Sequence, residues 1–459
     1  MKISTVNPQD KTALAQQRDL MQQRVAQSLA KRHAKEKRFK LTGQLAVGTA
    51  LAFVAILFIS IFSKGLPAFW QATLTLDIYF DPDIILIDEK PVQAAGESDA
   101  TFQERYQAWQ MDLAFINFNG LILNALAEVI PEAAAHPRDA MRLVTSGERI
   151  ALRNLVEEDP SIIGSRKRLN LLADANVDVW IKGNIDRDLA DSRQQLSART
   201  RGWVDQLVEQ GVIKNRFSTA LFMNADSRSS LASAGLAGAF MGSLMMMLIV
   251  MFLAVPLGVA SAIYLEEFAP KNKLTDLIEV NINNLAAVPS IVFGLLGASV
   301  FILWFKLPLS APVVGGLVLS LMTLPTVIIA TRSTLKAIPP SIRSAALGIG
   351  ASKVQSVFHH VLPLAIPGIL TGSILGIAQA LGETAPLLLI GMSSFVASVP
   401  SSPFDQSTAL PVQIYLWQGN ELRNFFEART SAAIIVLLTM MISLNALAIW
   451  LRRHFENRW

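Results

Sequence analysis

The chain has 459 residues, of which 52% are hydrophobic and only 17% are charged, and its formal net charge is +4. Soluble domains carry about 25% charged residues, so this composition, with charge-free runs of about 20 residues, excludes a wholly soluble protein and predicts several membrane spans. The absence of cysteine excludes disulfides, thiolate metal sites and thiol catalysis. Basic residues lie mainly in the N-terminal segment and in short loops, a distribution that argues against nucleic-acid binding.

The N-terminal segment, residues 1–40, is polar and basic. It holds ten Lys or Arg against three Asp or Glu, which by the positive-inside rule places the N-terminus in the cytoplasm. Residues 12–38 predict a helix with sparse apolar positions. Two interpretations stay open: the helix lies on anionic lipid or docks on a partner, or it is a solvated arm that only sets the topology.

The first apolar run, residues 41–63, is longer than a signal-peptide core of about 7–15 residues and predicts an uncleaved first span. The predicted spans are six: 41–63, 234–263, 278–304, 311–335, 364–392 and 431–451. An even number returns the tail, 453–459, to the cytoplasm, where Arg452, Arg453 and Arg458 agree with that side. We therefore expect an all-α multi-pass protein of a bacterial inner membrane.

Residues 64–232, between the first two spans, have the composition of a soluble domain. Charged residues mix with periodic Leu, Val and Ile, so we expect a mainly helical periplasmic insertion. TLDIYF (75–80) and DVWIKGN (178–184) are its predicted strands. His136 is its only histidine, and no nucleophile–base or metal-ligand spacing occurs there. The sequence therefore assigns no chemistry to the insertion.

Residues 233–452 are predicted to form the membrane core. Glu266 and Glu267 follow the second span and are expected to lie in a solvated loop, with contact to a partner as the alternative. In the third span, Asn284 and Ser290 flank a proline and either open a kinked polar segment of a translocation pathway or pack helices together. Glycines are expected where helices approach closely, at positions 294, 297, 372, 376 and 382.

Arg332 ends the fourth span, in LPTVIIATR (324–332). Its guanidinium fork is suited to binding an oxyanion. The alternative is a basic anchor at the inner end of a membrane helix.

The next loop, 336–363, contains SAALGIGASKVQSVFHHVLP. Its characteristic residues are Ser344, Ala345, Ala346, Gly350, Val361, Leu362 and Pro363. Small alanines let a short helix enter a cleft on a partner, the glycine permits a sharp turn, and the proline marks the start of a new helix. The pattern resembles the loop with which permease subunits of ABC importers contact their ATPase. Serine stands where that family usually has glutamate, so one polar contact of the usual loop is missing.

GIGASK (348–353), within this loop, lacks the G-x-x-x-x-G-K-[ST] spacing of a phosphate-binding loop, and no other segment has it. The chain is therefore expected to be non-catalytic and to need no cofactor. ATP and Mg²⁺ would be bound by a separate ATPase subunit.

The fifth span carries a single charged residue, Glu383, in QALGETAPLLLIG (379–391). A carboxylate in hydrocarbon costs about 2.5–3.5 kcal/mol and usually faces the bundle interior with a partner. Two roles stay open for Glu383 and the adjacent Thr384. Either the carboxylate accepts backbone N–H groups freed near Gly382 and Pro386 or pairs with an arginine, or it is a gate that holds a basic residue until the transported anion displaces it.

Three segments in this order, PLGVASAIYLEEFAPKNKLT (256–275), NNLAAVPSIVFGLLG (283–297) and GETAPLLLIG (382–391), resemble the PstA-type permease subunit of phosphate ABC importers. The resemblance covers spans two to six and leaves the N-terminal arm and the insertion unexplained. It implies four partners: a PstC-type permease, a dimer of ATP-binding subunits, a periplasmic phosphate-binding protein and membrane lipid. The alternatives are a permease for another oxyanion, such as sulfate or molybdate, and a membrane-anchored periplasmic sensor.

Overall fold

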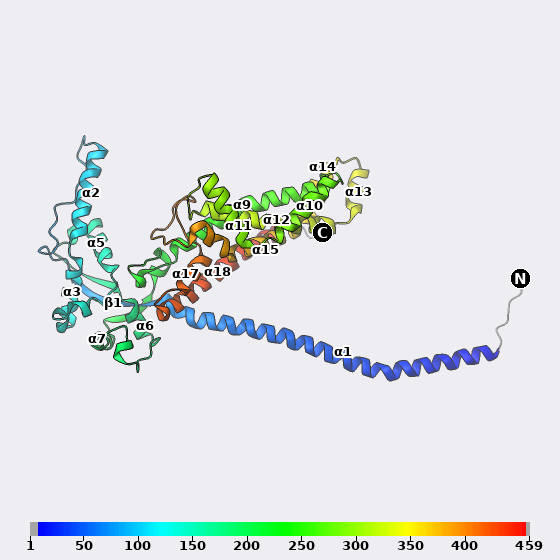
Figure 1. The fold of residues 1–459 in the computed structure, drawn as a ribbon, viewed down its shortest axis with the longest axis horizontal. Coiled ribbons are helices and arrows are strands. Elements are labelled where there is room, and N and C mark those ends of the chain that lie inside the picture. The colour runs from blue at the N-terminus through cyan, green and yellow to red at the C-terminus, as the bar shows by residue number, and fades with distance from the viewer. Residues whose placement is uncertain (1–7, 456–459) are drawn as a thin grey trace. The chain divides into compact units, whose positions relative to one another are not determined.

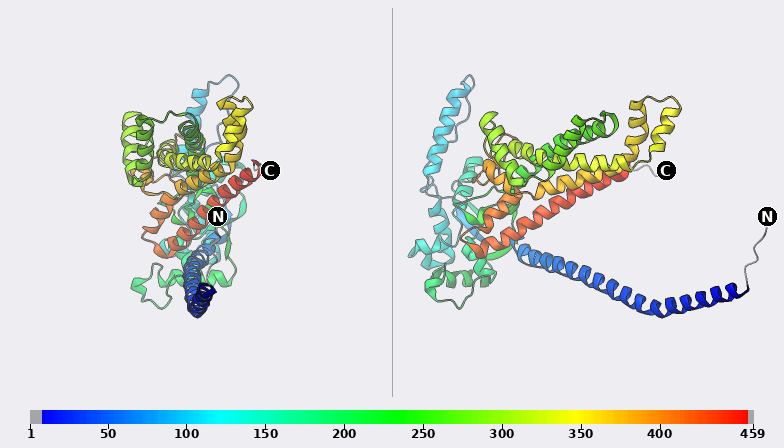
Figure 2. Two further views of the ribbon diagram at one scale, coloured as in Figure 1. Left: turned by 90° about the vertical axis from the view of Figure 1, so that its right-hand side faces the viewer. Right: turned by 45° about the vertical axis from the view of Figure 1, so that its right-hand side comes forward.

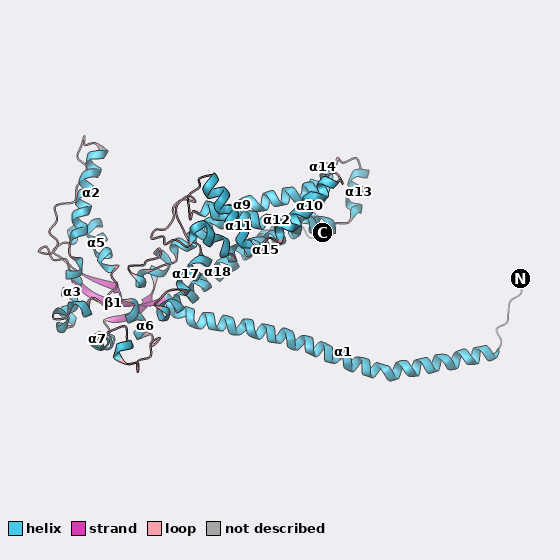
Figure 3. Cartoon of the chain, viewed as in Figure 1, coloured by secondary structure: helices cyan, strands magenta, loops and turns pink. Residues whose placement is uncertain are grey.

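The computed structural model describes residues 8–455; residues 1–7 of the basic arm and 456–459 of the tail, with Arg458, lie outside the described residues. The chain divides into two compact units, Met1–Ser63 and Lys64–Trp459. Helices dominate the described chain, and the second unit also contains one small sheet (Figures 1 and 3). The predicted fold class, mainly helical with a mixed insertion, is confirmed.

The described part of the first unit is one helix, α1, which runs from Pro8 to Gly65 and so ends just inside the second unit. The helix predicted at 12–38 is confirmed, but no break separates it from the first span. Hydroxyl groups in the apolar part donate to carbonyls one turn back, as Thr49 does to Leu45 at 2.8 Å. Such a helix satisfies its own polar groups and suits a hydrocarbon environment.

The insertion folds around a three-stranded antiparallel sheet of order β2-β1-β3. The strands are β1 (Trp70–Tyr79), β2 (Arg166–Leu172) and β3 (Ile213–Phe217). The helices are α2 (Asp99–Phe115), α3 (Phe118–Val129), α4 (Pro137–Ala140), α5 (Glu148–Glu158), α6 (Ala175–Ile181), α7 (Ala198–Glu209) and α8 (Thr219–Met223). In the register, Thr73 lies opposite Leu172 and Trp70 lies opposite Phe217.

One face of β1 forms the centre of the insertion core. Leu74, Leu76 and Ile78 alternate along the strand and are almost completely buried, as a strand with one covered face requires. On the opposite face, Asp77 pairs with Arg168 of β2 at 2.9 Å. The strand predicted at 75–80 is thus confirmed, although it begins earlier and ends one residue sooner.

The strand predicted at 178–184 is wrong, because most of these residues belong to α6. Asp174 caps this helix, and its side chain accepts a hydrogen bond from the Asn176 N–H at 2.9 Å. Val177 and Trp180, three positions apart, are both buried. That spacing and the preceding cap fit a helix better than a strand.

The remaining helices of the second unit form an elongated bundle (Figure 2). They are α9 (Ala237–Ile263), α10 (Lys273–Ala286), α11 (Ser290–Gly297), α12 (Pro312–Ala337), α13 (Pro340–Gly348), α14 (Lys353–Ser356), α15 (Leu362–Gly382), α16 (Ala385–Leu387), α17 (Leu410–Gln418) and α18 (Arg423–Phe455). By length and composition, five described helices can cross a membrane, or six if the bent pair α10–α11 is one span.

Two predicted spans are not single helices. The third is bent by 101° between α10 and the helix that begins at Ser290, because Pro289 donates no N–H and restricts the residue before it. The fifth stops at Gly382, and Glu383 and Thr384 are not helical. In addition, the stretch 393–430, between the last two predicted spans, contains α17 and the start of α18.

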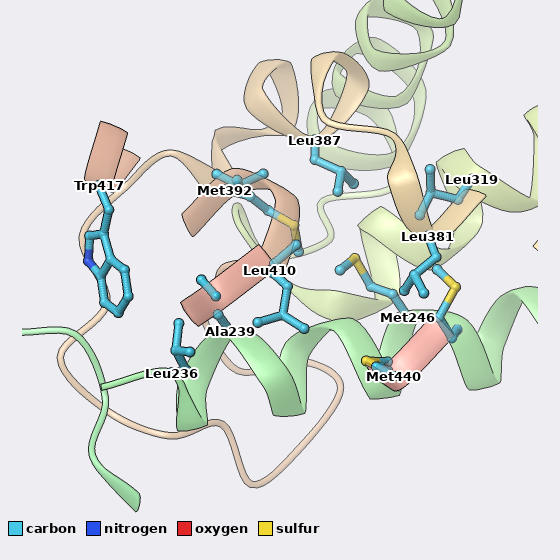
Figure 4. Close-up of a cluster of buried hydrophobic side chains, with 14 of the residues drawn as sticks. Leu236, Ala239, Met246, Leu319, Leu381, Leu387, Met392, Leu410, Trp417 and Met440 are labelled. Atoms are coloured by element: carbon cyan, nitrogen blue, oxygen red, sulfur yellow. The ribbon is translucent and has the colours of Figure 1, made fainter. Parts of the chain in front are cut away.

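The bundle core brings together side chains from distant parts of the sequence (Figure 4). Met246 from α9, Leu381 from the end of α15, Met392 beyond the break and Leu410 from α17 are each at most 4% exposed. The chain on both sides of the break at 383–384 is therefore anchored in the same apolar core.

Close helix approach at glycine is confirmed at four of the five predicted positions. A Cβ atom on Gly294 would lie 2.7 Å from Pro386 Cα, which no side chain tolerates without displacement. The other confirmed positions are Gly297, Gly372 and Gly376. The prediction is wrong for Gly382, where nothing lies within 4 Å of an added Cβ, because this residue ends α15 beside the break.

Candidate functional site

The motif at 344–363 covers the end of α13, all of α14, the π-helical turn Val357–Val361 and the start of α15. We call α13 and α14 the motif helices. They lie at the end of the bundle away from the insertion (Figure 1). The Ala351 N–H donates to Ala346 O at 3.1 Å and the Gly350 N–H to Leu347 O at 3.0 Å, which is the Schellman ending of a helix. Gly350 has φ +88°, a conformation that side chains disfavour. The spacing of alanine and glycine thus encodes a short helix that ends in a fixed turn.

The motif residues divide between a buried side and an exposed side. Ala346 and Val361 are buried, and Val361 belongs to a small apolar cluster with Leu335 and Ile338 at the end of α12. Leu362 and Pro363 are partly buried where α15 begins, and Ser344 and Ala345 are exposed.

Large apolar side chains are also exposed on the motif helices and next to them. Ile349 is 83% exposed, Val354 55%, and Leu347 and Phe358 50% each. Such a cluster at one end of a molecule indicates a surface that a partner covers.

A network of charged side chains ties the motif helices to the ends of α9 and α12. Arg343, in α13, binds Glu267 with its Nε at 3.1 Å and its Nη2 at 2.5 Å from Oε1. Its guanidinium also donates to the carbonyls of Ile338 and Leu335, both at 2.9 Å. Glu267 is only 8% exposed and lies in the π-helical turn Tyr264–Phe268 that follows α9.

Arg332 is paired within the chain. Its Nη2 lies 3.2 Å from Glu266 and 2.5 Å from Glu279 of α10, and Lys336 lies 3.7 Å from Glu266. The prediction of a solvated loop for Glu266 and Glu267 is therefore wrong, because both carboxylates are held by arginines. The fork of Arg332 already binds carboxylates, so an oxyanion would have to compete with them.

Sequence reasoning missed the ion pair of Glu267 and Arg343. One signal was present: two adjacent carboxylates directly follow the second predicted span, and arginines stand near the end of the fourth predicted span and in the loop after it. Charged side chains at such places are rarely buried unless they are paired. The sequence does not say which arginine meets which carboxylate, since that depends on how α9, α12 and α13 pack.

Glu383 occupies the break between α15 and α16. It is partly buried, and its N–H donates to Ala380 O at 3.3 Å. The Thr384 carbonyl accepts from the N–H groups of Leu387 and Leu388, both at 3.1 Å. Within the described part of the chain, the Glu383 carboxylate has no hydrogen-bond or ion-pair partner. The break is thus held by backbone contacts and apolar packing, and the carboxylate is left available.

The two broken spans meet just beyond their breaks. Gly294, one turn after Ser290, packs against Pro386, three residues after Glu383. The structure therefore brings two of the predicted pathway segments together. Asn284 is exposed at the end of α10, before the bend. Arg332 belongs to the separate charge network near the motif helices.

At the other end of the bundle, Arg429 joins α18 to the insertion. It is 2% exposed and lies over the ring of Phe425 at 4.6 Å. Its guanidinium donates to Gln71 Oε1 of β1 at 3.1 Å, to Ala232 O at 2.7 Å and to Ala234 O. One buried side chain thus connects the insertion sheet, the segment that leads to α9, and α18.

The insertion contains a buried carboxyl group, Glu148, at the start of α5. Burial raises its pKa to about 7, opposed in part by the hydrogen bond that it accepts from the Leu172 N–H at 3.1 Å. No group of His, Asp or Glu side chains in the described chain is arranged to hold a metal ion. Burial thus gives the insertion a carboxyl group with a pKa near neutrality.

Comparison with known families assigns separate matches to the N-terminal part of the chain and to most of the helical bundle. Residues 254–459 match the family described as "Binding-protein-dependent transport system inner membrane component". Residues 26–191 match a domain of unknown function, DUF3333.

Individual relatives match about half of the chain. The chain is 32% identical to the phosphate transport system permease protein PstA of Yersinia pestis over 50% of this chain and 77% of that protein. It is 28% identical to the probable ABC transporter permease protein YqgI of Bacillus subtilis over 54% of this chain and 87% of that protein. Among solved structures, the inward-facing MetNI methionine ABC transporter has 15% identity, covering 47% of this chain and 94% of that chain, with a TM-score of 0.38, too low to bear on the fold.

Proposed function

Because the chain belongs to the family of binding-protein-dependent transport system inner membrane components, we propose that it is the PstA-type permease subunit of an ATP-driven phosphate importer. Members of this family are non-catalytic, multi-pass membrane subunits, and ATP is hydrolysed on a separate ATPase of the same transport complex. The observation that carries the phosphate assignment is the interrupted helix at GETAP with its single carboxylate, in a segment related to the PstA proteins.

Phosphate would cross the membrane next to the paired breaks. Ser290 and Glu383 with Thr384 stand at the two breaks, and we assign these residues to the pathway or its gate. Asn284 is assigned to the same pathway because it is exposed on the helix that precedes the bend. Arg332 is assigned to its inner end, where an arriving phosphate would compete with Glu266 and Glu279.

The motif helices would bind the ATPase. Their exposed apolar side chains supply a surface for burial, and the Schellman turn at Gly350 fixes its shape. Closure of two ATPase subunits on ATP would displace this loop, 336–363, and its counterpart on a PstC-type partner. The spans would then rock between inward- and outward-open states as rigid bodies.

The remaining segments complete the topology. We assign residues 1–40 to a cytoplasmic arm, 41–63 to the first span, 64–232 to the periplasm, 233–452 to the permease core and 453–459 to a cytoplasmic tail. Phosphate would be delivered by a periplasmic binding protein at the side of the insertion. A sensor function is not supported, because the chain is a transport component.

Uptake of radiolabelled phosphate decides the substrate. Parent cells, cells that lack this chain and the same cells complemented with it are compared for phosphate, sulfate and molybdate uptake at low external concentration. We expect loss of phosphate uptake alone, restored by the chain. Loss of sulfate or molybdate uptake with normal phosphate uptake would replace the phosphate assignment with another oxyanion.

A further inference from the structure

The π-helical turn Tyr264–Phe268, at the end of α9, is held by both motif helices. From α13, Arg343 binds both carboxylate oxygens of Glu267, with its Nη2 2.5 Å from Oε1 and its Nε 3.2 Å from Oε2. From α14, the Lys353 ammonium lies 5.5 Å from the centre of the Phe268 ring. Irregular turns of this kind are frequent at functional sites. Here the turn is the place where α9 meets the loop that follows α12.

Arg343 connects three elements at once. Besides Glu267, it donates to Leu335 O and Ile338 O at the end of α12, both at 2.9 Å. Those carbonyls lie at the C-terminal end of α12, where a helix leaves carbonyl groups short of internal partners and cations are favoured. The Leu335 carbonyl also accepts from the Ile338 N–H at 3.3 Å. α13 is therefore attached through one side chain to the ends of both α9 and α12.

The pair is built to hold its geometry. A guanidinium and a carboxylate that meet through two parallel contacts resist rotation, unlike a single point contact. Glu267 is 8% exposed and Arg343 is about a quarter exposed, with 24% of its side-chain surface accessible, so water and salt weaken the pair far less than a surface pair. Lys336, by contrast, is 57% exposed and lies 3.7 Å from Glu266.

We propose that Arg343 and Glu267 are positioning residues that transmit displacement of the motif helices to α9 and α12. The inference rests on the proposed function, because the displacement comes from an ATPase bound to the motif helices. It goes beyond the contact surface itself: the exposed side of α13 would bind the ATPase, and the buried side would move the membrane helices. Breaking the pair then leaves an ATPase that binds and hydrolyses ATP but no longer drives transport.

The test uses the complete importer in membrane vesicles, with ATP hydrolysis and phosphate uptake measured in parallel. Glu267→Gln weakens the link to α9 while Arg343 keeps its two carbonyl contacts with α12. Arg343→Lys keeps the charge and loses the fork. For both variants we expect normal co-purification with the ATPase, basal ATP hydrolysis within about two-fold of the unaltered protein, and about ten-fold less phosphate moved per ATP. Lys336→Gln, the matched control at an exposed pair, should behave as the unaltered protein.

A second readout does not depend on the substrate. Because the chain has no cysteine, Ser394→Cys places a single thiol in the exposed segment after the second break. ATP with vanadate should change its labelling rate in the unaltered background and leave that rate unchanged with Glu267→Gln. A nucleotide response without phosphate uptake would refute the phosphate assignment and leave the pair testable. Full transport per ATP in both variants, or failure of both to assemble with the ATPase, would overturn the role of the pair.

Discussion

At the scale of single residues, partly buried charged side chains in this protein are of two kinds, those paired within the chain and one that is unpaired among the described residues. Arg332 and Arg343 each meet carboxylates, so their cost of burial is offset by charge-assisted hydrogen bonds. Glu383 has no such partner among the described residues, yet it is placed at a helix break in the membrane core. A carboxylate within the membrane usually has a partner. We therefore expect Glu383 to contact a basic group on another subunit of the importer.

Glu383→Gln tests this role. Since backbone contacts and apolar packing already hold the break, we expect the variant to assemble normally and phosphate uptake to fall at least about ten-fold. Uptake and co-purification of the complex are measured together. Glu421→Gln, at an exposed position between α17 and α18, is the control. Loss of assembly would assign Glu383 a structural role instead.

Glu148 makes the stability of the insertion depend on pH. Its folded pKa of about 7 lies above the ordinary value of 4.5, so the folded state favours the protonated form. The contribution of Glu148 to the free energy of unfolding is therefore fully present below pH 4.5. It is lost as the pH rises from 4.5 through 7, a decrease of about 3 kcal/mol. Glu148→Gln should remove this dependence and raise the melting temperature at pH 8. Thermal unfolding of the full chain, followed by tryptophan fluorescence at pH 5 and pH 8, measures the effect. An equal change in melting temperature between the two pH values in the unaltered protein and in the variant would contradict it.

At the scale of elements, the motif at 344–363 is built on short helices with well-defined ends. The Schellman turn ends α13, and a capping box of Ser352 and Gln355 begins α14. The family pattern of alanines and glycine is therefore a local structural code, which explains why sequence reasoning located the motif. The exposed and buried sides of that code were not evident, because they depend on α9 and α12.

Gly350→Val tests the turn. With φ +88° a β-branched residue is strained by about 1–2 kcal/mol, so the motif helices should change their relative orientation. We expect weaker binding of the ATPase in co-purification and a proportional loss of transport. Gly348→Ala is the matched control, since Gly348 has an ordinary φ and free space around it. Equal ATPase binding by both variants would show that the turn is not needed.

At the scale of the whole molecule, the insertion and the bundle are joined by buried contacts. Arg429 of α18 holds Gln71 of β1 and the carbonyls before α9. Gln71 in turn donates to Ala232 O at 2.7 Å and accepts from Ser218 at 2.9 Å. The insertion is thus an extension of the bundle, suited to presenting a fixed surface at that side of the membrane.

Arg429→Gln should loosen this junction. The Ala234 carbonyl loses its arginine donor, whereas Ala232 O keeps Gln71 as a donor. A buried carbonyl without a donor costs about 1–3 kcal/mol, so the segment 224–236 should become sensitive to protease while the bundle stays folded. Arg423→Ala, at an exposed position one helix turn and a half earlier, is the control and should leave the cleavage rate unchanged. Equal protection of both variants would show that Gln71 and Ser218 suffice.

The sequence by itself determined the elements whose signals are local: apolar runs long enough to span a membrane, the helix of the basic arm, the strand at 75–80 and the alanine–glycine motif. It did not determine α6, where the apolar run suggested a strand but the Asp174 cap starts a helix. Nor did it determine the bends at Pro289 and Glu383, since a break is tolerated only where neighbouring helices pack around it. Only the tertiary structure decided that Glu267 meets Arg343 and that Arg429 meets Gln71. Those partners lie 76 and 358 residues apart, and a buried charge selects its partner by proximity in the packed fold.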